Sequence, residues 1–126
     1  MGINSRIGYY CGVLISQYGV LKQLKDSDIE IALKSMGLSN FWTIDSGKMN
    51  ESSDFVIIHP KRKGTHKDLG DHSSKGNYAV TLPNCKPKLT AQEIKDMNRI
   101  YNVFKSSLKN KDYRVEKGWF AVSFMD

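Results

Sequence analysis

The clearest pattern of apolar and polar positions lies in residues 91–109, where apolar side chains recur every three or four positions. That spacing predicts an amphipathic helix with one face toward a core. Thr90 and Glu93 have the spacing of a capping box at its start, and Leu89 is placed to pack against Ile94. The predicted core face of this helix consists of Ile94, Met97, Tyr101, Phe104 and Leu108.

A second, shorter helix is predicted over residues 27–36. Ser27 and Glu30 again have capping-box spacing, and Gly37 stands where a left-handed C-terminal cap belongs. The buried stripe of this helix is predicted to be Ile29, Leu33 and Met36.

The same segment also fits a different motif. Residues 28–39 are similar in pattern to the first helix and turn of a helix-turn-helix, which would place a recognition helix next. Residues 40–45 have the composition of a strand, however, so a capped core helix is the preferred interpretation.

Three runs of aromatic and β-branched residues predict strands, because such side chains suit a pleated, half-buried surface. Gly, Asn, Ser and Pro bound these runs, and Pro60 and Pro83 end two of them. The predicted strands are residues 41–44, 55–58 and 78–82.

The two ends of the chain leave alternatives open. Residues 5–24 fit both helical spacing and a shorter alternation typical of a strand, and a helix is the preferred interpretation. Residues 113–115 and 119–124 flank a bend at Lys117 and Gly118, which predicts a final hairpin or one bulged strand. The helical spacing near the N-terminus is that of Ile7, Cys11, Leu14, Tyr18 and Leu21.

These elements predict one α+β domain spanning residues 1–126. A chain of 126 residues is long enough for one core and too short for two. The order of the predicted elements favours an antiparallel sheet of about four strands, with two or three helices packed on one face.

The positive charge of the chain is concentrated in its C-terminal half. The net charge is +6, and residues 1–60 contribute −1 while residues 61–126 contribute +7. Such a field attracts a phosphate-rich partner, namely RNA, single-stranded nucleic acid or a nucleotide, or else an acidic protein surface. A net charge of this size also serves solubility alone. Fifteen of the nineteen cations are Lys, which favours point-charge contacts with phosphates over bidentate reading of bases.

Cysteine usage and hydropathy suggest a compartment. The chain has two cysteines, Cys11 and Cys85, and no secretory signal, so both are expected to be reduced thiols in a cytoplasmic protein. The apolar stretch at residues 7–21 is too short and too mixed for a membrane span, and no membrane partner is expected.

Residues 58–76 are the candidate site. They contain all three histidines and five Lys/Arg between two apolar runs, and we expect a polar loop. The basic flank of the last helix, including Lys109, is expected to extend this site, and Tyr78 is the aromatic residue preferred for stacking against a base. The predicted ligand-binding residues are His59, Lys61, Arg62, Lys63, His66, Lys67, His72, Lys75, Tyr78, Lys95 and Arg99.

Most other aromatic side chains are expected in the core, because aromatic burial dominates the energetics of small domains. The aromatic residues considered for a stacking surface are Tyr9, Tyr10, Phe41, Trp42, Tyr78, Trp119 and Phe120.

The three histidines do not predict a metal site. His59, His66 and His72 are separated by seven and six residues, intervals that match none of the short paired spacings of zinc sites. No metal and no cofactor are therefore predicted, even though Asp68 and Asp71 lie nearby.

A catalytic role for His66 is the main alternative. An imidazole beside several cations could take a proton from a ribose 2′-hydroxyl while the cations hold the phosphate. Gly64-Thr65-His66, followed by residues 78–82 and Pro83, resembles the Gly-Ser-His segment of HicA-type mRNA interferase toxins. That resemblance covers residues 27–109 and implies a helix, three strands, helix fold with His66 as the catalytic residue. Thr65 replaces the family's Ser, and a second His is missing.

Three functions follow from the sequence. The preferred one is a non-catalytic module that binds a phosphate-rich partner. The first alternative is a small RNA-cleaving enzyme that uses His66. The second is a protein–protein inhibitor or accessory factor encoded by a virus or mobile element.

Overall fold

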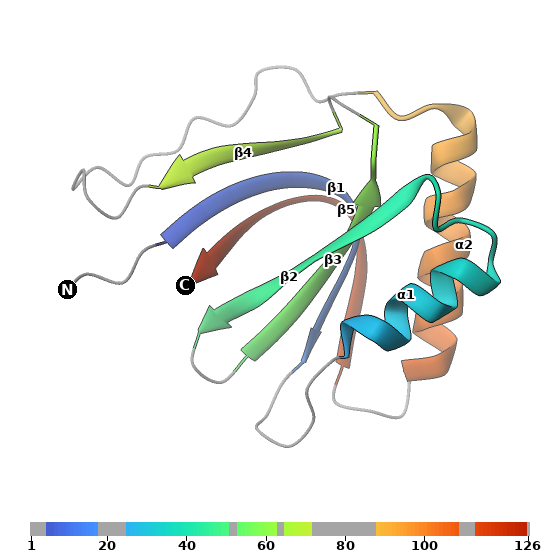
Figure 1. The fold of residues 1–126 in the computed structure, drawn as a ribbon, viewed down its shortest axis with the longest axis horizontal. Coiled ribbons are helices and arrows are strands. Elements are labelled where there is room, and N and C mark those ends of the chain that lie inside the picture. Colours follow the sequence, from blue (N-terminus) through green and yellow to red (C-terminus); the bar gives the residue numbers. More distant parts are fainter. Residues whose placement is uncertain are drawn as a thin grey trace.

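In the computed structural model of the protein, one long strand, β1 (Ser5–Gln17), lies within an antiparallel sheet (Figure 1). The structure describes residues 5–17, 25–50, 53–62, 65–71, 88–108 and 113–125. Within these ranges there are five strands and two helices, which confirms an α+β fold with an antiparallel sheet. The remaining elements are α1 (Asp26–Ser35), β2 (Trp42–Asn50), β3 (Ser53–Pro60), β4 (His66–Asp71), α2 (Ala91–Leu108) and β5 (Tyr113–Met125).

β1 pairs with three other strands. β5 runs antiparallel along its whole length, from Ser5 opposite Met125 to Gln17 opposite Tyr113. The opposite edge of β1 is shared, because β4 pairs with residues 6–10 and β3 pairs with residues 13–16. β2 pairs with the outer edge of β3. One edge of β1 therefore changes partner between residues 10 and 13, from β4 to β3, and we call this point the division of the sheet.

A glycine stands at that division. A Cβ atom on Gly12 would lie 1.8 Å from the carbonyl oxygen of Ile58 in β3, a distance that no side chain tolerates. The residue opposite Gly12 in β5 is Gly118, whose φ of +133° is strained for any residue with a side chain. Glycine at both positions lets the backbones approach and bend at this point.

The sheet buries apolar side chains on both faces. One face forms the main core with both helices, and Ile29, Leu33, Ile100 and Phe104 are the helical side chains buried there. The other face carries a smaller cluster. That cluster consists of Tyr10, Leu14, Phe55, Ile57 and Val122, with Phe120 packed against it.

The prediction of a helix near the N-terminus is wrong for residues 5–17, which form β1. Both faces of this strand are buried: Val13 and Ile15 face the helices, whereas Tyr10 and Leu14 face the smaller cluster. A strand that is buried on both faces carries apolar residues at positions that also match helical spacing, which misled the prediction. The rest of the predicted segment, residues 18–24, lies outside the described residues.

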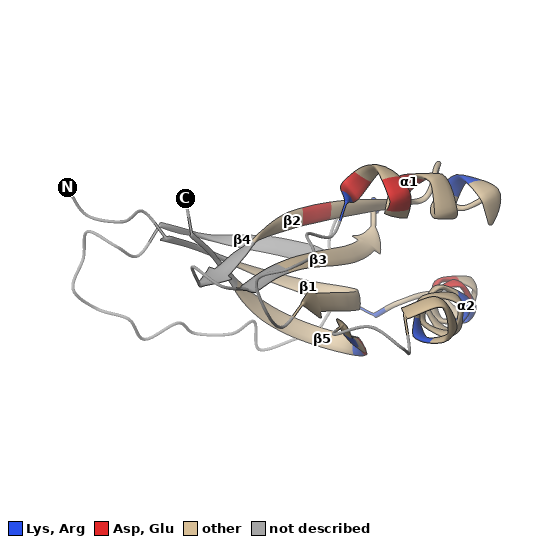
Figure 2. Cartoon of the chain, turned by 90° about the horizontal axis from the view of Figure 1, so that it is seen from below, with Lys and Arg blue, Asp and Glu red and all other residues tan. Residues whose placement is uncertain are grey.

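The helix over residues 27–36 is confirmed as α1, with Ile29 and Leu33 buried, but its predicted capping box is wrong. The helix begins one residue earlier, Lys25 occupies the N-cap, and no side chain caps the helix there. The Asp26 carboxylate instead accepts a 2.8 Å hydrogen bond from the Ser46 hydroxyl of β2. This bond joins the acidic first turn of α1 to β2 (Figure 2), but it does not satisfy the backbone amides that a cap would satisfy.

The other predicted elements have mixed outcomes. The run at 55–58 lies in β3, and the run at 41–44 lies in β2 except for Phe41, which precedes the strand. Because β2 begins at Trp42, the helix-turn-helix alternative is wrong. The predicted strand at 78–82 lies outside the described residues. The C-terminal segment is one continuous strand, β5.

The amphipathic helix is confirmed as α2, and its capping box forms: the Glu93 amide donates to Thr90 Oγ1 at 3.1 Å, and the Thr90 amide donates to Glu93 Oε1 at 2.8 Å. Four of the five predicted core residues belong to the main core or pack against it, namely Met97, Tyr101, Phe104 and Leu108, and Ile94 does not. Ile100 is fully buried, whereas Ile94 is 45% exposed. The sheet packs against the edge of the apolar stripe that contains Ile100 and leaves Ile94 partly exposed. The spacing of apolar residues in the sequence does not show which edge of the stripe will be buried.

Truncation of the buried aromatic residue of α2 should be costly. Phe104→Ala removes a side chain from the main core, so we expect a loss of roughly 3–5 kcal/mol in the free energy of unfolding. The neighbouring Val103 is 40% exposed, and Val103→Ala should change stability by no more than about 0.5 kcal/mol. Urea unfolding of both variants tests this, and equal losses would contradict the core assignment.

Substitution at the division of the sheet should be damaging even for the smallest side chain. In Gly12→Ala the new methyl group meets the Ile58 carbonyl, which belongs to the backbone and cannot rotate away. We expect a loss of about 1–3 kcal/mol or more in the free energy of unfolding, with the antiparallel pairing of β1 and β3 weakened. Hydrogen exchange of the β3 amides measures that pairing, and unchanged protection would contradict this account.

Candidate binding groove

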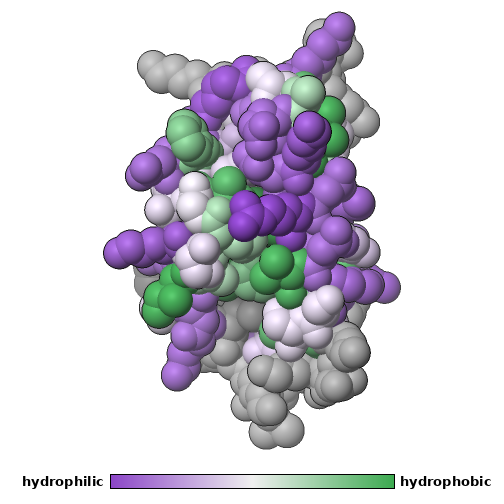
Figure 3. All heavy atoms as spheres, turned by 90° about the vertical axis from the view of Figure 1, so that its right-hand side faces the viewer, coloured by the Kyte–Doolittle hydropathy of each residue, from purple (hydrophilic) through white to green (hydrophobic). Residues whose placement is uncertain are grey.

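A groove of about 680 Å³ lies between the C-terminal end of α1, the start of β2, the connection after β3 and the first half of α2. Figure 3 shows the side of the molecule on which the helices lie, where apolar surface is exposed between hydrophilic side chains. We call this feature the α1–α2 groove. It is lined by Met36, Gly37, Leu38, Asn40, Phe41, Trp42, Lys61, Arg62, Thr90, Gln92, Glu93, Asp96 and Arg99.

The end of α1 shapes the first wall of the groove. The Leu38 amide donates to the Leu33 carbonyl at 2.9 Å, and the Gly37 amide donates to the Lys34 carbonyl at 3.0 Å. This pair of bonds is a Schellman motif, and Gly37 has the positive φ, +73°, that the motif requires. The predicted glycine cap is therefore confirmed, and it turns the chain away from the helix toward β2.

Two further bonds tie this wall to its neighbours. Arg99 of α2 donates from Nη1 to the Met36 carbonyl at 3.0 Å, so a side chain of one helix satisfies the last turn of the other. The Lys61 amide donates to the Phe41 carbonyl at 2.9 Å, which joins the chain after β3 to the chain before β2. The groove is thus built from segments held together by hydrogen bonds.

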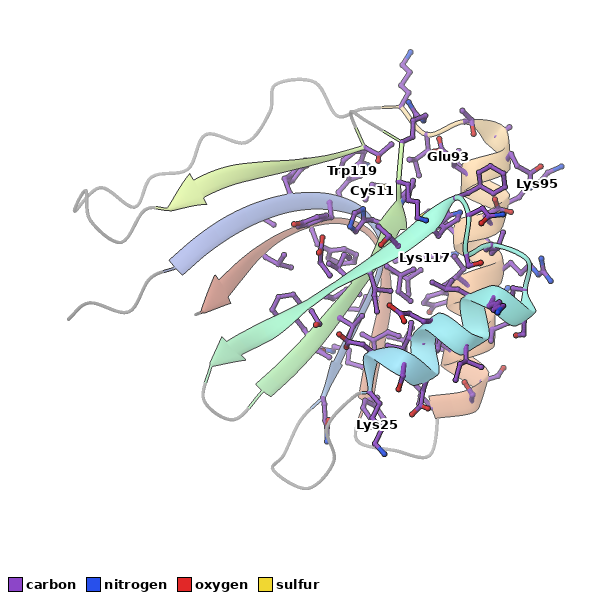
Figure 4. All side chains as sticks on the ribbon, viewed as in Figure 1. Cys11, Lys25, Glu93, Lys95, Lys117 and Trp119 are labelled. Carbon is purple, nitrogen blue, oxygen red and sulfur yellow. The ribbon has the colours of Figure 1, made fainter. Side chains whose placement is uncertain are left out.

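A bidentate ion pair joins the connection after β3 to the start of α2. Arg62 Nε lies 3.2 and 3.1 Å from the two Glu93 carboxylate oxygens, and Arg62 Nη2 lies 2.9 Å from Oε1. The same Nη2 donates to the Lys88 carbonyl at 2.8 Å. Figure 4 shows Glu93 near the start of α2. The guanidinium is therefore fixed in direction at the edge of the groove.

The pair shifts the pKa of both members. Hydrogen bonding from Arg62 lowers the pKa of Glu93 below its usual value, against a smaller opposing effect of burial, and the Thr90 amide lowers it further. The hydrogen bond with Glu93 raises the pKa of Arg62, so the guanidinium stays charged.

The groove has an apolar floor and one exposed aromatic side chain. Leu38 and Trp42 are buried, whereas Phe41 is 67% exposed. Phe41 lies in the turn before β2, whereas Trp42 is the first residue of the strand and packs in the main core. Phe41 was one of the seven aromatic residues considered for a stacking surface. The feature of the sequence that could have singled it out is its position next to Trp42. Tyr78, the preferred candidate, lies outside the described residues.

The charges around the groove are mixed but net positive. Lys61, Arg62 and Arg99 line it with Glu93 and Asp96. Since Glu93 is already paired with Arg62, cations remain in excess.

The structure therefore brings together three of the predicted ligand-binding residues, namely Lys61, Arg62 and Arg99. Lys95 is exposed on α2 and does not line the groove, and Figure 4 shows its side chain extending away from the sheet. The structure describes only the backbone of His66 and Lys67, which belong to β4. The remaining predicted site residues, all outside the described ranges, are Lys63, His72, Lys75, Tyr78 and Lys109.

The prediction that residues 58–76 form one polar loop is wrong at two places, because β3 continues through Pro60 and β4 spans His66–Asp71. His59 is consequently 2% exposed within the sheet, although it was expected among exposed ligand-binding residues. Its ring contacts Asp45 and Tyr10. The flanking strands carry His59 inward because it lies on the same sheet face as Phe55 and Ile57.

A second depression, of about 510 Å³, differs in character. It lies between α2 and the strands β1 and β5, and Lys88 is the cation that lines it. Cys11 is at its base, 2% exposed and not in a disulfide, as expected of a reduced core thiol. Cys85 lies outside the described residues. With one cation beside an apolar lining, this depression suits an anion less well than the α1–α2 groove does.

Comparisons with protein-family models, curated proteins and solved structures gave no match. Within the described residues, three strands (β2, β3 and β4) lie between α1 and α2. The predicted strand at 78–82, on which the resemblance to mRNA interferase toxins depends, is outside them. In the sheet, β1 lies between β3 and β4. Within the described ranges, no helix is both long and apolar enough to cross a membrane, and no cluster of three or more metal-ligating side chains occurs.

The Arg62–Glu93 pair should contribute to stability above the usual pKa of a glutamate. A lowered pKa means that the unfolded chain binds more protons in acid, so this contribution is lost as the pH falls through the folded pKa. Glu93→Gln and Arg62→Gln should each flatten the acid side of the stability profile, and the double variant should add little. Urea unfolding between about pH 3 and 7 tests this. Additive flattening would contradict a shared interaction.

Proposed function

We propose that the α1–α2 groove binds one nucleotide unit of RNA or single-stranded nucleic acid, or a free nucleotide, without cleaving it. The base would stack on Phe41, and the phosphate would lie near Lys61 and Arg62. The observation that supports this proposal is the presence of an exposed aromatic ring and several cations on one groove.

The aromatic side chain supports the base-binding half of the proposal. Phe41 is 67% exposed beside the buried Trp42, so its ring offers apolar area that the fold itself does not use. Stacking of a base on such a ring is tolerant of sequence, because every base has a π-face. A site of this kind would bind single strands, whose bases are accessible, in preference to a duplex.

The cations support the phosphate-binding half. Lys61 is exposed and adjacent in sequence to Arg62, whose guanidinium is held by Glu93 and the Lys88 carbonyl. A fixed guanidinium loses little conformational entropy when it binds a phosphate, and a flexible ammonium adds a point charge. The excess of cations in residues 61–126 would attract the same ligand from a distance.

Loss of the aromatic ring should weaken binding without unfolding the protein. Phe41→Ala is expected to raise the Kd for a single-stranded RNA of about ten nucleotides by roughly 5- to 150-fold, the range of one base–aromatic stack. Ile31→Ala is the matched control, because Ile31 is 66% exposed on α1 outside the groove. That control should leave the Kd within about twofold, as measured by fluorescence anisotropy.

Salt dependence tests the phosphate contacts in the same assay. For two or three contacts with a single strand, the Kd should rise about 7- to 18-fold between roughly 50 and 200 mM salt. Lys61→Ala should reduce the slope of log K against log salt by about 0.7, whereas Lys34→Ala, an exposed cation of α1, should not. The proposal fails if RNA does not bind at low salt, or if both groove variants bind like the wild type.

Two other functions remain predictions from the sequence. RNA cleavage by His66 depends on a side chain that the structure does not describe. Docking on an acidic protein would use the same cations, and failure of RNA to bind at low salt would favour it.

A further inference from the structure

A buried polar cluster lies behind the α1–α2 groove, within the sheet. His59 of β3 is 2% exposed, and its Nε2 atom lies 2.9 Å from Oδ2 of Asp45 in β2. Its Nδ1 atom lies 2.9 Å from the carbonyl oxygen of Pro60. Tyr10 of β1 covers the imidazole, with ring centroids 4.8 Å apart. The Asp45 side chain is 44% exposed, so the cluster reaches solvent on one side.

Both ring nitrogens of His59 therefore face an oxygen that is normally an acceptor. A neutral imidazole has one N–H, so with an ionised Asp45 it would leave one nitrogen lone pair opposite an oxygen lone pair. Two protons satisfy both contacts, either both on the ring or one on the ring and one on the carboxyl group. From this geometry we infer that the His59–Asp45 pair retains one extra proton in the folded protein, and that His59 thereby positions Lys61 and Arg62 at the groove.

The link from His59 to the groove passes through the Pro60 carbonyl. Thr65 is fully buried, and its hydroxyl lies 2.6 Å from the Arg62 carbonyl and 3.3 Å from the Pro60 carbonyl. A hydroxyl has one proton, and the shorter contact takes it. The His59 ring N–H is then the stronger donor to the Pro60 carbonyl. The peptide group containing this carbonyl includes the Lys61 amide, which in turn donates to the Phe41 carbonyl.

Loss of the extra proton should disturb this arrangement. Among the contacts described for the imidazole are the Asp45 carboxyl group of β2 and the Tyr10 ring of β1. Once the proton has gone, one of the two hydrogen bonds of His59 is replaced by repulsion between lone pairs. Lys61 and Arg62 should shift at the same time.

The proton can be observed directly. Nitrogen NMR of labelled protein at about pH 7 should give His59 ring signals of a hydrogen-bonded pair that holds the extra proton, and Asp45→Asn should convert the ring to the neutral pattern. The amide signals of Lys61 and Arg62 should move with the same midpoint when the pH is raised. Single His66→Gln and His72→Gln variants assign the other two imidazoles and serve as controls.

The effect on ligand affinity rests on the proposed function, whereas the NMR measurements do not. The wild-type Kd for single-stranded RNA should rise as the pH is raised between about 6 and 8, by the factor with which the RNA prefers the protonated protein. The RNA keeps its phosphodiester charge over this range, so such a change comes from the protein. Asp45→Asn and His59→Gln, which cannot hold the extra proton, should bind with little dependence on pH. Asp45 is half exposed, so its variant should still fold if the His59 variant does not.

The outcomes separate the two ideas. A neutral His59 ring at about pH 7, or Lys61 and Arg62 amide signals that ignore the His59 titration, would overturn the inference even if RNA binds. Failure of RNA to bind at any pH, with the predicted NMR signals present, would refute the proposed function and support the positioning role. Binding whose pH dependence survives in Asp45→Asn would also overturn the inference.

Discussion

The close approach of β1 to β3 at Gly12 is the constraint on which the rest of the structure depends. Gly12 has no side chain, so its backbone can approach the Ile58 carbonyl more closely than any other residue would allow. β3 can therefore pair closely with one half of β1 while β4 pairs with the other half. The chain must then cross from β3 to β4 at this division. That crossing contains Lys61 and Arg62, so the branching of the sheet places both cations at one end of the fold.

The α1–α2 groove forms where three chain segments end or begin at that place. α1 ends in a glycine cap, α2 begins with a capping box, and the crossing between β3 and β4 bonds to α2 through Arg62 and to the chain before β2 through the Lys61 amide. The backbone groups at the end of α1 and the start of α2 are hydrogen-bonded within each segment or to the side chains of Arg99 and Glu93. The side chains of Phe41 and Lys61 remain exposed. The groove is therefore rigid in its walls and open in the side chains available to a ligand, as a binding site requires. His59 lies behind it and extends the same hydrogen-bonded network into the sheet.

Local signals in the sequence predicted the helices well. The capping box at Thr90 and the glycine cap at Gly37 involve residues within a few positions of each other, and both form, whereas the equally local capping box predicted at Ser27 does not. Prediction failed where burial came from distant segments. β1 was interpreted as a helix because apolar residues on both of its faces matched helical spacing as well as strand alternation. β4 was missed because its polar residues gave no strand pattern. Of the candidate site, the sequence singled out Lys61, Arg62 and Arg99 but not their meeting with Phe41.

The sequence by itself determined the composition of the candidate site: a concentration of positive charge after residue 60, two capped helices and a set of aromatic residues. Only the tertiary structure decided which of these residues share a surface. It buried His59 against Asp45 and exposed Phe41, because the partner of each side chain lies on another strand or helix. Residues 41, 62 and 99 are far apart along the chain, and no local pattern encodes their separation in space. Long-range pairing through β1 sets that separation, since it fixes where β3 ends and where α2 packs.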